Sequence, residues 1–244
     1  MIGVVLAAGP GRRLGALTEA LPKTLLPVDG EGTILDRALA NLRAAGLERA
    51  VVVTGFASER IAERVPALEE RHGVVVELLY NDRALEWNNA YSLWLTREAL
   101  CEGAILVNGD TVHPPSVQRA LLGARGDADL VLAVDREKAL GEEEMKVLLD
   151  GSGRMTRVHK AIDPGRAHGE YIGVALVEPR AAAALADALE ATWRRDPALY
   201  YEDGFQELAD RGGAVTTAAI GAVDWVEVDN DSDLARAREI ACRF

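Results

Sequence analysis

Two short stretches near the N-terminus carry the residue types that bind phosphate groups. The first is Leu6-Ala7-Ala8-Gly9-Pro10-Gly11-Arg12-Arg13-Leu14, and the second is Pro22-Lys23-Thr24-Leu25-Leu26-Pro27-Val28. Glycines let the backbone approach a ligand closely with its N–H groups facing anionic oxygens, and the arginines and lysine add positive charge. The apolar run 2–6 fits a buried strand. The pattern predicts a phosphate-binding loop at the end of that strand.

The glycine spacing alone also fits a dinucleotide-binding loop or an ordinary tight turn. Leu14 stands where the dinucleotide fingerprint has its third glycine, and an arginine pair lies inside the loop. Pro22 and Pro27 forbid a continuous helix after the loop. Lys23 lies between a proline and an apolar run, an unusual position for a lysine that is only solvated. These features argue against the dinucleotide interpretation.

Two aspartates, Asp110 and Asp229, each follow a short apolar run that is typical of a strand. Ligands of open α/β sheets collect at the carboxyl ends of strands, so we expect both carboxylates at one edge. Carboxylates about 4 Å apart repel by roughly 4 kcal/mol at an effective dielectric near 20, and a bound divalent cation removes that repulsion. Glu227, two residues from Asp229, is a reserve ligand. Alternatively, Asp110 ends a turn and Asp229 or Asn230 caps the last helix.

Alternating helix and strand patterns predict the elements that position these residues. Helices are expected at 33–46, 58–71, 115–122, 180–193, 202–210 and 232–242, and strands at 2–6, 50–54, 74–80, 104–107, 128–134, 145–149, 155–158, 171–177, 214–219 and 225–228. The first half is typical of a parallel sheet with crossover helices. The successive strands from 145 to 177 predict an antiparallel extension that forms the acceptor pocket. The segment 81–95 is polar and aromatic before it becomes helical, and its Asn88 and Asn89 are expected either to cap that helix or to contact a ligand.

Length and composition restrict the class of protein. The chain has 244 residues, 49% hydrophobic and 27% charged, which fits one large α/β domain without a membrane span of about 20 apolar residues. Its start lacks a basic leader, which predicts a cytoplasmic protein without a signal peptide. The net charge of −12 argues against nucleic acid as a partner. Cys101 and Cys242 have no partners at metal-ligand spacing and are predicted to be packing residues.

The two N-terminal stretches resemble the signature of the nucleotidyltransferase superfamily, Leu-Ala-Ala-Gly-x-Gly-x-Arg-Leu, a spacer, then Pro-Lys-x-Leu-Leu-Pro-Val. Later motifs are similar to the phosphocholine cytidylyltransferase branch, which includes enzymes acting on aminoalkyl phosphonates. These motifs are Asn88-Asn89-Ala90-Tyr91-Ser92-Leu93, Glu144-Met145-Lys146-Val147, Gly169-Glu170-Tyr171-Ile172-Gly173-Val174 and Trp225-Val226-Glu227-Val228-Asp229. We therefore expect a Rossmann-like three-layer α/β fold with a mostly parallel mixed sheet. Residues 1–244 would form a single domain, with a nucleotide-binding part (1–135), an acceptor-binding part (136–225) and a closing helix (226–244).

The resemblance implies that an acceptor's phosphate or phosphonate oxygen attacks the α-phosphorus of CTP and that pyrophosphate leaves, with Mg²⁺ as cofactor. Lys23, Arg13, Lys146 and Lys160 are the candidate catalytic residues, although surface-facing alternation also explains the last two. The candidate nucleotide-binding residues are Leu6, Ala7, Ala8, Gly9, Gly11, Arg13, Lys23, Asn81, Asn88, Asn89 and Asp110. The metal ligands would be Asp110 and Asp229, with Glu227 in reserve.

Aromatic and acidic residues of the second half bear on the acceptor. Tyr171, Tyr201 and Trp225 are candidates for a cage around a quaternary ammonium, where a cation over a ring contributes about 0.5–2 kcal/mol. Glu202 and Asp203 suit a primary amine instead, and the choice between a quaternary ammonium and an amine-bearing acceptor stays open. Tyr91 and Trp94 at helical spacing fit the core better than a cage. The alternative functions are a sugar-1-phosphate nucleotidyltransferase using dTTP or UTP and a non-catalytic nucleotide-binding relative. The oligomeric state is not predicted.

Overall fold

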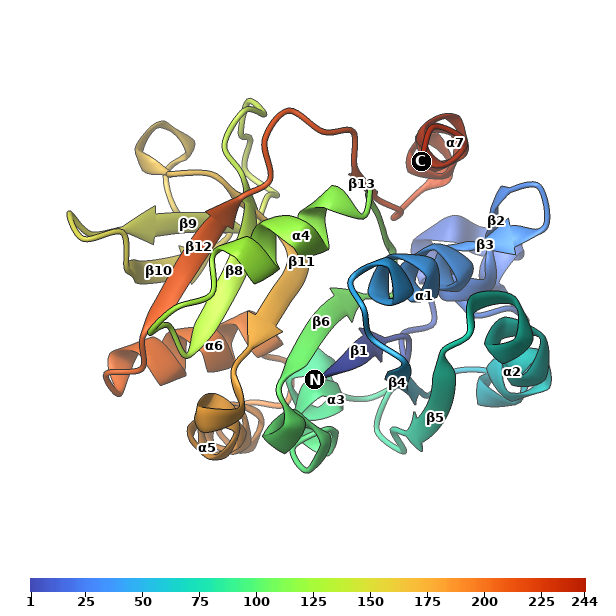
Figure 1. The fold of residues 1–244 in the computed structure, drawn as a ribbon, viewed down its shortest axis with the longest axis horizontal. Helices are drawn as coiled ribbons and strands as arrows, with labels where there is room; N and C mark the ends of the chain where they lie inside the picture. Colours follow the sequence, from blue (N-terminus) through green and yellow to red (C-terminus); the bar gives the residue numbers. More distant parts are fainter.

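The computed structural model describes residues 1–244 and contains a nine-stranded mixed sheet (Figure 1). The strands are β1 (Ile2–Leu6), β2 (Pro27–Asp29), β3 (Gly32–Thr33), β4 (Arg49–Thr54), β5 (Val75–Tyr80), β6 (Ala104–Asn108), β7 (Thr111–Val112), β8 (Leu130–Asp135), β9 (Lys146–Leu149), β10 (Met155–His159), β11 (Glu170–Val177), β12 (Val215–Ala219) and β13 (Val226–Glu227). The α-helices are α1 (Ile34–Ala44), α2 (Ser58–His72), α3 (Asn89–Leu95), α4 (Ser116–Gly123), α5 (Ala182–Arg195), α6 (Tyr201–Asp210) and α7 (Asp231–Ala241). The main sheet has the order β10-β9-β11-β6-β1-β4-β5, with β8 between β11 and β12 on a branch.

The sheet combines two pairing patterns, as the sequence predicts. Strands β5, β4, β1 and β6 are parallel neighbours, which matches their alternation with helices in the sequence. Strand β11 runs antiparallel to β6 and also pairs with β8 and β9, so it joins the parallel part to the antiparallel extension. The expected mixed α/β fold is confirmed. The sheet is continuous from β5 to β10, and the proposed boundary at residue 135 falls at the end of β8.

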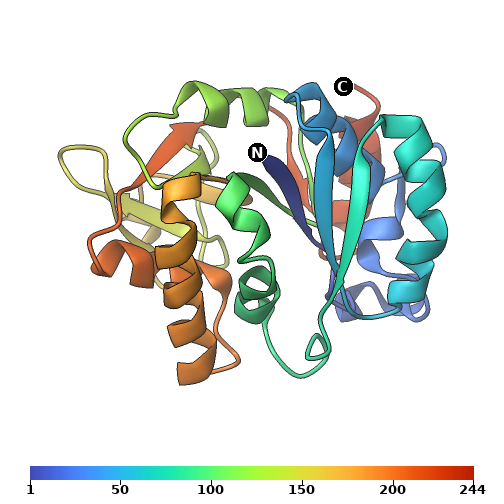
Figure 2. The ribbon, with the colours of Figure 1, turned by 60° about the horizontal axis from the view of Figure 1, so that its bottom comes forward.

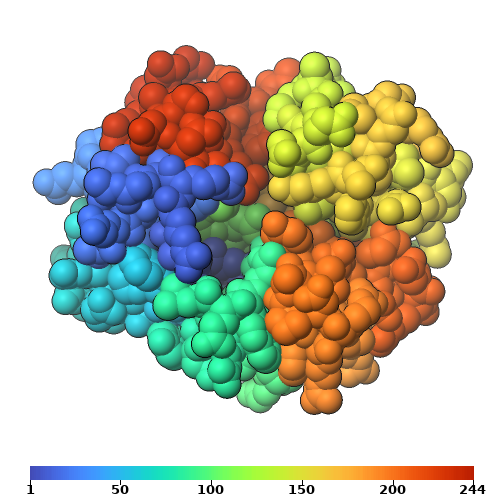
Figure 3. Space-filling view, turned by 180° about the vertical axis from the view of Figure 1, so that it is seen from behind, coloured from blue at the N-terminus to red at the C-terminus, as the bar shows by residue number.

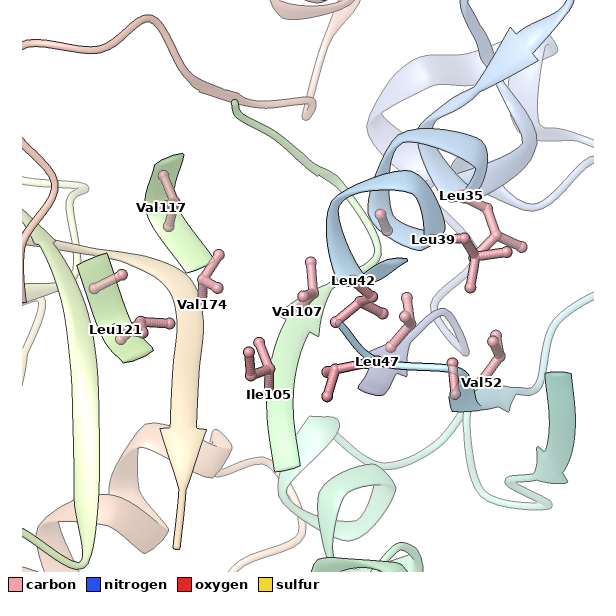
Figure 4. Packing of buried hydrophobic residues seen from close by; sticks show 14 of the residues in the cluster. Leu35, Leu39, Leu42, Leu47, Val52, Ile105, Val107, Val117, Leu121 and Val174 are labelled. Carbon is pink, nitrogen blue, oxygen red and sulfur yellow. The ribbon is translucent and has the colours of Figure 1, made fainter. Parts of the chain in front are cut away.

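Helices cover both faces of this sheet and give it three layers (Figure 2). On one face, α1, α2 and α4 pack on the sheet from β5 to β8, where leucines of α1 and α4 lie over Ile105, Val107 and Val174 (Figure 4). On the other face, α3, α5 and α6 enclose a second core with Leu93 and Phe205. Residues that alternate along each strand point to opposite faces, so these buried strands are apolar on both sides.

A third, smaller core joins the two ends of the chain. Helix α7 packs against the β2–β3 hairpin, and its Leu234 and Ile240 lie in one cluster with Leu14 and Leu26 of the N-terminal stretches. Asn230 begins α7 as its N-cap, in a capping box with Asp233. The cap is therefore Asn230, and the neighbouring Asp229 does not serve as the helix cap.

The expected helices and strands are found with boundaries that differ by a few residues, and two predictions need correction. The strand expected at 225–228 is the two-residue β13, which pairs with β7 outside the main sheet. Strands β2, β3 and β7 and the short 3-10 helices were not predicted. Cys101 and Cys242 are exposed rather than packed, because one lies in the 3-10 helix Ala99–Glu102 and the other at the end of α7.

Three of the four tryptophans gather in one aromatic cluster between α3 and α5. Trp87 stacks on Trp193 with ring centroids 5.5 Å apart, and Trp94 meets Trp193 edge-on at 5.3 Å. Tyr91 contacts all three of these rings. The expectation that Tyr91 and Trp94 belong to packing rather than to a ligand cage agrees with this arrangement, although both side chains are only partly buried.

None of the helices combines the length and the apolar character that crossing a membrane requires.

Candidate active site

A cleft of about 780 Å³ opens at the carboxyl ends of β1 and β6. Figure 3 shows it as a hollow ringed by the N-terminal segment, residues near 90, the 140–170 region, residues near 200 and the C-terminal segment. Gly109 lets two strands approach closely at its floor, because a Cβ there would lie 2.5 Å from the carbonyl oxygen of Leu6. The cleft is large enough for a nucleotide and lies where ligands of α/β sheets bind.

The N-terminal loop forms one wall of the cleft. Gly11 has a φ of 60°, in the left-handed region that favours glycine, and its carbonyl accepts a 2.8 Å hydrogen bond from Thr18. A Cβ at Gly11 would lie 2.9 Å from the Cβ of Lys23, so the glycine also lets the loop pack on that lysine. The two predicted phosphate-binding stretches are thereby brought together in space.

Lys23 lies between the two aspartates that were predicted to bind a metal. Its Nζ is 2.7 Å from Asp110 Oδ2 and 3.0 Å from Asp229 Oδ1. Arg13, whose side chain is 75% exposed, contacts the other oxygen of Asp229 at 2.9 Å. Burial by itself lowers the pKa of Lys23, but attraction to Asp110 and then Asp229 outweighs it, so the pKa is raised. The lysine is therefore charged at neutral pH.

The short β7–β13 ribbon positions the carboxylates. Asp110 immediately precedes β7, whose Thr111 pairs with Glu227 of β13, and the Val228 N–H donates to the carbonyl of Asp110 at 2.9 Å. Asp110, Glu227 and Asp229 each offer a carboxylate oxygen within 4.8 Å of the other two. The expected convergence of the aspartates is present, although this two-stranded ribbon, rather than two strands of the main sheet, produces it.

Lys23 does not fully neutralise the negative charge of the cluster formed by Asp110, Glu227 and Asp229. Repulsion from Asp110 is the largest cause that raises the pKa of Glu227 to about 8, followed by desolvation of its carboxylate. Asp110 Oδ1 is buried and has no hydrogen-bond partner. An unpaired carboxylate oxygen beside two further carboxylates is a set of hard oxygen donors that fits a divalent cation such as Mg²⁺.

Aromatic and acidic residues also line this cleft or lie directly behind its lining. The Tyr201 hydroxyl donates to Asn108 Oδ1 at 2.9 Å and lies 3.2 Å from the Tyr171 hydroxyl. Glu202 is buried, and its Oε2 has no hydrogen-bond partner. Burial raises the pKa of Glu202 to about 7. Trp225 donates its indole N–H to Asp135 Oδ2 at 2.7 Å.

Most predicted site residues line this cleft. They are Leu6, Ala7, Ala8, Gly9, Gly11, Arg13, Lys23, Asn88, Asn89, Asp110, Lys160, Tyr171, Glu202, Trp225, Glu227 and Asp229. Asn88 caps α3 and donates to the Ala198 carbonyl, while Asn89 accepts from the Tyr201 N–H, so both asparagines also have structural partners.

Three predicted residues do not line the cleft. The ammonium of Lys146 is fully buried and donates to the carbonyls of Gly141, Glu142 and Glu144, so the expected phosphate contact does not fit its position. Asn81 is buried and donates to Ser92, which turns it away from the nucleotide role expected for it. Tyr201 lies behind the wall, so it supports the cleft rather than facing an acceptor.

Several polar residues of the cleft were not predicted from the sequence, among them Asn108, Asp135, Lys138 and Glu170. Asn108 directly follows a predicted strand and precedes Asp110, so its position was a usable signal. Lys138 lies in a loop without periodicity, and only the folded chain shows what it contacts.

Comparisons with known proteins show the family and the fold of the chain. Residues 3–210 match the family model of the MobA-like NTP transferase domain. The chain is 30% identical over 245 residues to the CMP-5'-(3-aminopropyl)phosphonate synthase of Streptomyces rubellomurinus, covering 96% of this chain and 38% of that protein. It is 31% identical over 106 residues to a choline-phosphate cytidylyltransferase of Streptococcus pneumoniae, covering 43% of each chain. The alignments therefore span less than half the length of both relatives.

A solved structure shows the same fold. The inositol-1-phosphate CTP transferase from T. maritima superimposes with a TM-score of 0.84 at 24% sequence identity, covering 99% of this chain and 94% of that chain.

Proposed function

Because the chain belongs to the MobA-like NTP transferase family, whose named relatives here are nucleotidyltransferases, we propose that it transfers CMP from CTP to a small aminoalkyl phosphate or phosphonate, such as phosphocholine, with release of pyrophosphate. One observation carries this proposal. Lys23, Arg13 and three carboxylates converge in a cleft that Tyr171, Glu202 and Trp225 also line. That combination suits a phosphate-rich donor and a cationic acceptor bound in the same cleft.

The protein needs no covalent nucleophile for this reaction. An oxygen of the acceptor attacks the α-phosphorus, and the bond from that phosphorus to the oxygen bridging the β-phosphate breaks. Lys23, Arg13 and the backbone N–H groups of Ala8, Gly9 and Gly11 would hold the donor phosphates and neutralise the charge that develops on them. Lys23 is already between the carboxylates and the loop, so a short movement of its side chain would bring it to a phosphate.

We propose Asp110 and Asp229 as the residues that hold Mg²⁺, with Glu227 as a third ligand. The unpartnered Oδ1 of Asp110 and the mutual proximity of the three carboxylates support this assignment. When bound, the ion would neutralise part of the phosphate charge and orient the reacting groups.

Glu202 is the residue proposed to bind the cationic end of the acceptor. Its Oε2 is buried without a partner at the wall of the cleft, and a buried polar atom without a hydrogen bond is costly. An ammonium group of the acceptor would satisfy it.

A pyrophosphate-release screen tests the proposal. CTP, UTP, dTTP and ATP are each combined with phosphocholine, phosphoethanolamine, 2-aminoethylphosphonate, inositol 1-phosphate and glucose 1-phosphate in the presence of Mg²⁺. We expect turnover with CTP and an amine-bearing acceptor. Turnover only with a sugar phosphate would overturn the acceptor assignment and favour the sugar-1-phosphate alternative.

Two variants test the catalytic assignment itself. Lys23→Ala and Asp110→Asn are each expected to reduce turnover by about 100-fold or more, because they remove groups that neutralise or organise the phosphates. Asp127 is an exposed carboxylate that does not line the cleft, so Asp127→Asn is the matched control for Asp110→Asn. Full turnover in both site variants would contradict the catalytic assignment of Lys23 and Asp110 and would favour the non-catalytic nucleotide-binding alternative.

A further inference from the structure

Lys138 places an ammonium group of the chain itself in the cleft, beside Trp225, which is one of the residues predicted to bind the acceptor. Its Nζ is 2.9 Å from Glu170 Oε2 and 3.4 Å from Glu144 Oε1. The same Nζ lies 5.4 Å from the centre of the Trp225 ring, within cation–π range. All four residues line the cleft. An aromatic face and two carboxylates thus already surround a cation.

The elements around Lys138 hold this arrangement in place. Asp135 at the end of β8 accepts the Lys138 backbone N–H at 3.1 Å and the Trp225 indole N–H at 2.7 Å, so one carboxylate orients both partners. Glu170 at the start of β11 is only 6% exposed and pairs in register with Asp135. Burial raises the pKa of Glu170, and Lys138 opposes that rise. The lysine is therefore the counter-charge of a buried carboxyl group and is not freely solvated.

A quaternary ammonium has no N–H group and depends on aromatic faces for recognition. The candidate faces here are already engaged, since Lys138 covers Trp225, and Tyr171 and Tyr201 are buried against each other. A primary ammonium has a different partner, because it can donate to the unpaired Oε2 of Glu202.

We propose that Lys138 determines acceptor specificity by occupying the Trp225 face, so that the site excludes a trimethylammonium group and directs a primary ammonium to Glu202. This inference rests on the proposed function, and it narrows the acceptor from aminoalkyl compounds in general to those with a primary amine. The contacts of the Lys138 ammonium are with Glu170, Glu144 and Trp225, and the proposal gives it no contact with the donor phosphates. Lys138 acts by occupying the face of the Trp225 ring that a trimethylammonium group would need.

Phosphoethanolamine and phosphocholine form a matched pair of acceptors, since they differ only in three N-methyl groups. We expect the wild-type chain to have the higher kcat/KM for phosphoethanolamine. Lys138→Ala frees the ring and leaves Glu170 and Glu144 around it, so the ratio of kcat/KM values should shift toward phosphocholine by about tenfold. Lys138→Arg keeps a cation over the ring and should keep the wild-type ratio. An unchanged ratio in Lys138→Ala, or a wild-type preference for phosphocholine, would overturn the inference.

Calorimetric titration with tetramethylammonium chloride tests, without any turnover, whether Lys138 blocks the binding of a quaternary ammonium at the Trp225 ring. The wild-type chain should show no binding and Lys138→Ala should bind the cation. Lys138→Gln keeps a hydrogen bond to Glu170 without the charge, and replaces Lys138→Ala in both measurements if that variant does not fold. Binding to the wild-type chain, or to none of the variants, contradicts the inference. Absence of CMP transfer to every acceptor would instead contradict the proposed function, while the titration would still decide whether Lys138 fills the ring site.

Discussion

Asp110 has one carboxylate oxygen paired with Lys23 and a second that is buried without a partner. It is also the largest source of the repulsion that raises the pKa of Glu227. Because a cation would satisfy the free oxygen and relieve the repulsion, Mg²⁺ should stabilise the folded chain. An ion at 100 times its Kd stabilises by about 2.7 kcal/mol, which is several degrees in Tm for a chain of this size.

Asp110→Asn should remove this stabilisation by Mg²⁺ while leaving the ion-free protein folded. The measurement is thermal unfolding with and without MgCl₂, at a pH above 8 so that Glu227 is ionised. Asp127→Asn should retain the full rise in Tm. A rise of equal size in Asp110→Asn would show that the ion binds elsewhere.

Glu202 makes stability depend on pH in a direction opposite to that of an ordinary ion-paired carboxylate. Burial raises its pKa from 4.5 to about 7 in the folded chain, so the folded state binds this proton more tightly than the unfolded state. The protonated Glu202 carboxyl contributes fully to the free energy of unfolding below pH 4.5, and this contribution is lost as the pH rises to about 7. The loss in unfolding free energy is about 3.5 kcal/mol at most, because a difference of one in pKa between the two states corresponds to about 1.4 kcal/mol.

Glu202→Gln should therefore flatten the decrease of unfolding free energy between pH 5 and pH 7. Urea unfolding without divalent ions, at several pH values, measures the effect. Glu70→Gln on the exposed side of α2 is the matched control and should keep the wild-type slope. An identical slope in Glu202→Gln would mean that another group causes the dependence.

At the scale of elements, α7 and the β7–β13 ribbon connect the C-terminal segment to the phosphate-binding stretches. Ile240 of α7 is 3% exposed and shares a core with Leu14 and Leu26, whereas Ile61 of α2 is fully buried in a different core. Truncating either isoleucine to alanine should lower the free energy of unfolding by about 2–5 kcal/mol.

The two truncations should differ in their effect on the nucleotide. Ile240→Ala loosens the support of Lys23 and Arg13, so KM for CTP should rise severalfold, while Ile61→Ala should leave it unchanged. Steady-state kinetics at a temperature where both variants remain folded, with urea unfolding in parallel, separates the two effects. Equal values of KM would show that α7 supplies only stability.

Elements with strong periodicity were predictable from the sequence, and very short ones were not. Helices such as α1 and strands such as β8 extend over enough residues for the apolar pattern to identify them. Strand β7 has two residues and was not predicted, and the strand expected at 225–228 is the two-residue β13. The two strands pair across more than 100 residues of chain, so no local pattern indicates that pairing. They are nevertheless the elements that bring Asp110 and Asp229 together.

The candidate site shows the same division at the scale of the whole molecule. Loop residues with a defined motif, such as Lys23 and Arg13, lie in the cleft as predicted. Lys146 lay in an equally suggestive motif, but its ammonium is used by three backbone carbonyls. The contacts of Lys138 and Glu170 depend on tertiary pairing between β8, β11 and the segment near 225, which the sequence alone does not show.

Of the four tryptophans, only Trp225 lines the cleft. Trp87, Trp94 and Trp193 form one cluster outside the cleft, while Trp225 lines it beside a lysine and a carboxylate. Intrinsic fluorescence should therefore respond to ligands through one indole, over a constant background from the other three. Trp225→Phe should abolish the ligand-dependent change in emission and leave most of the signal intact. The chain thus carries its own optical probe of the acceptor side, with an internal reference that needs no added label.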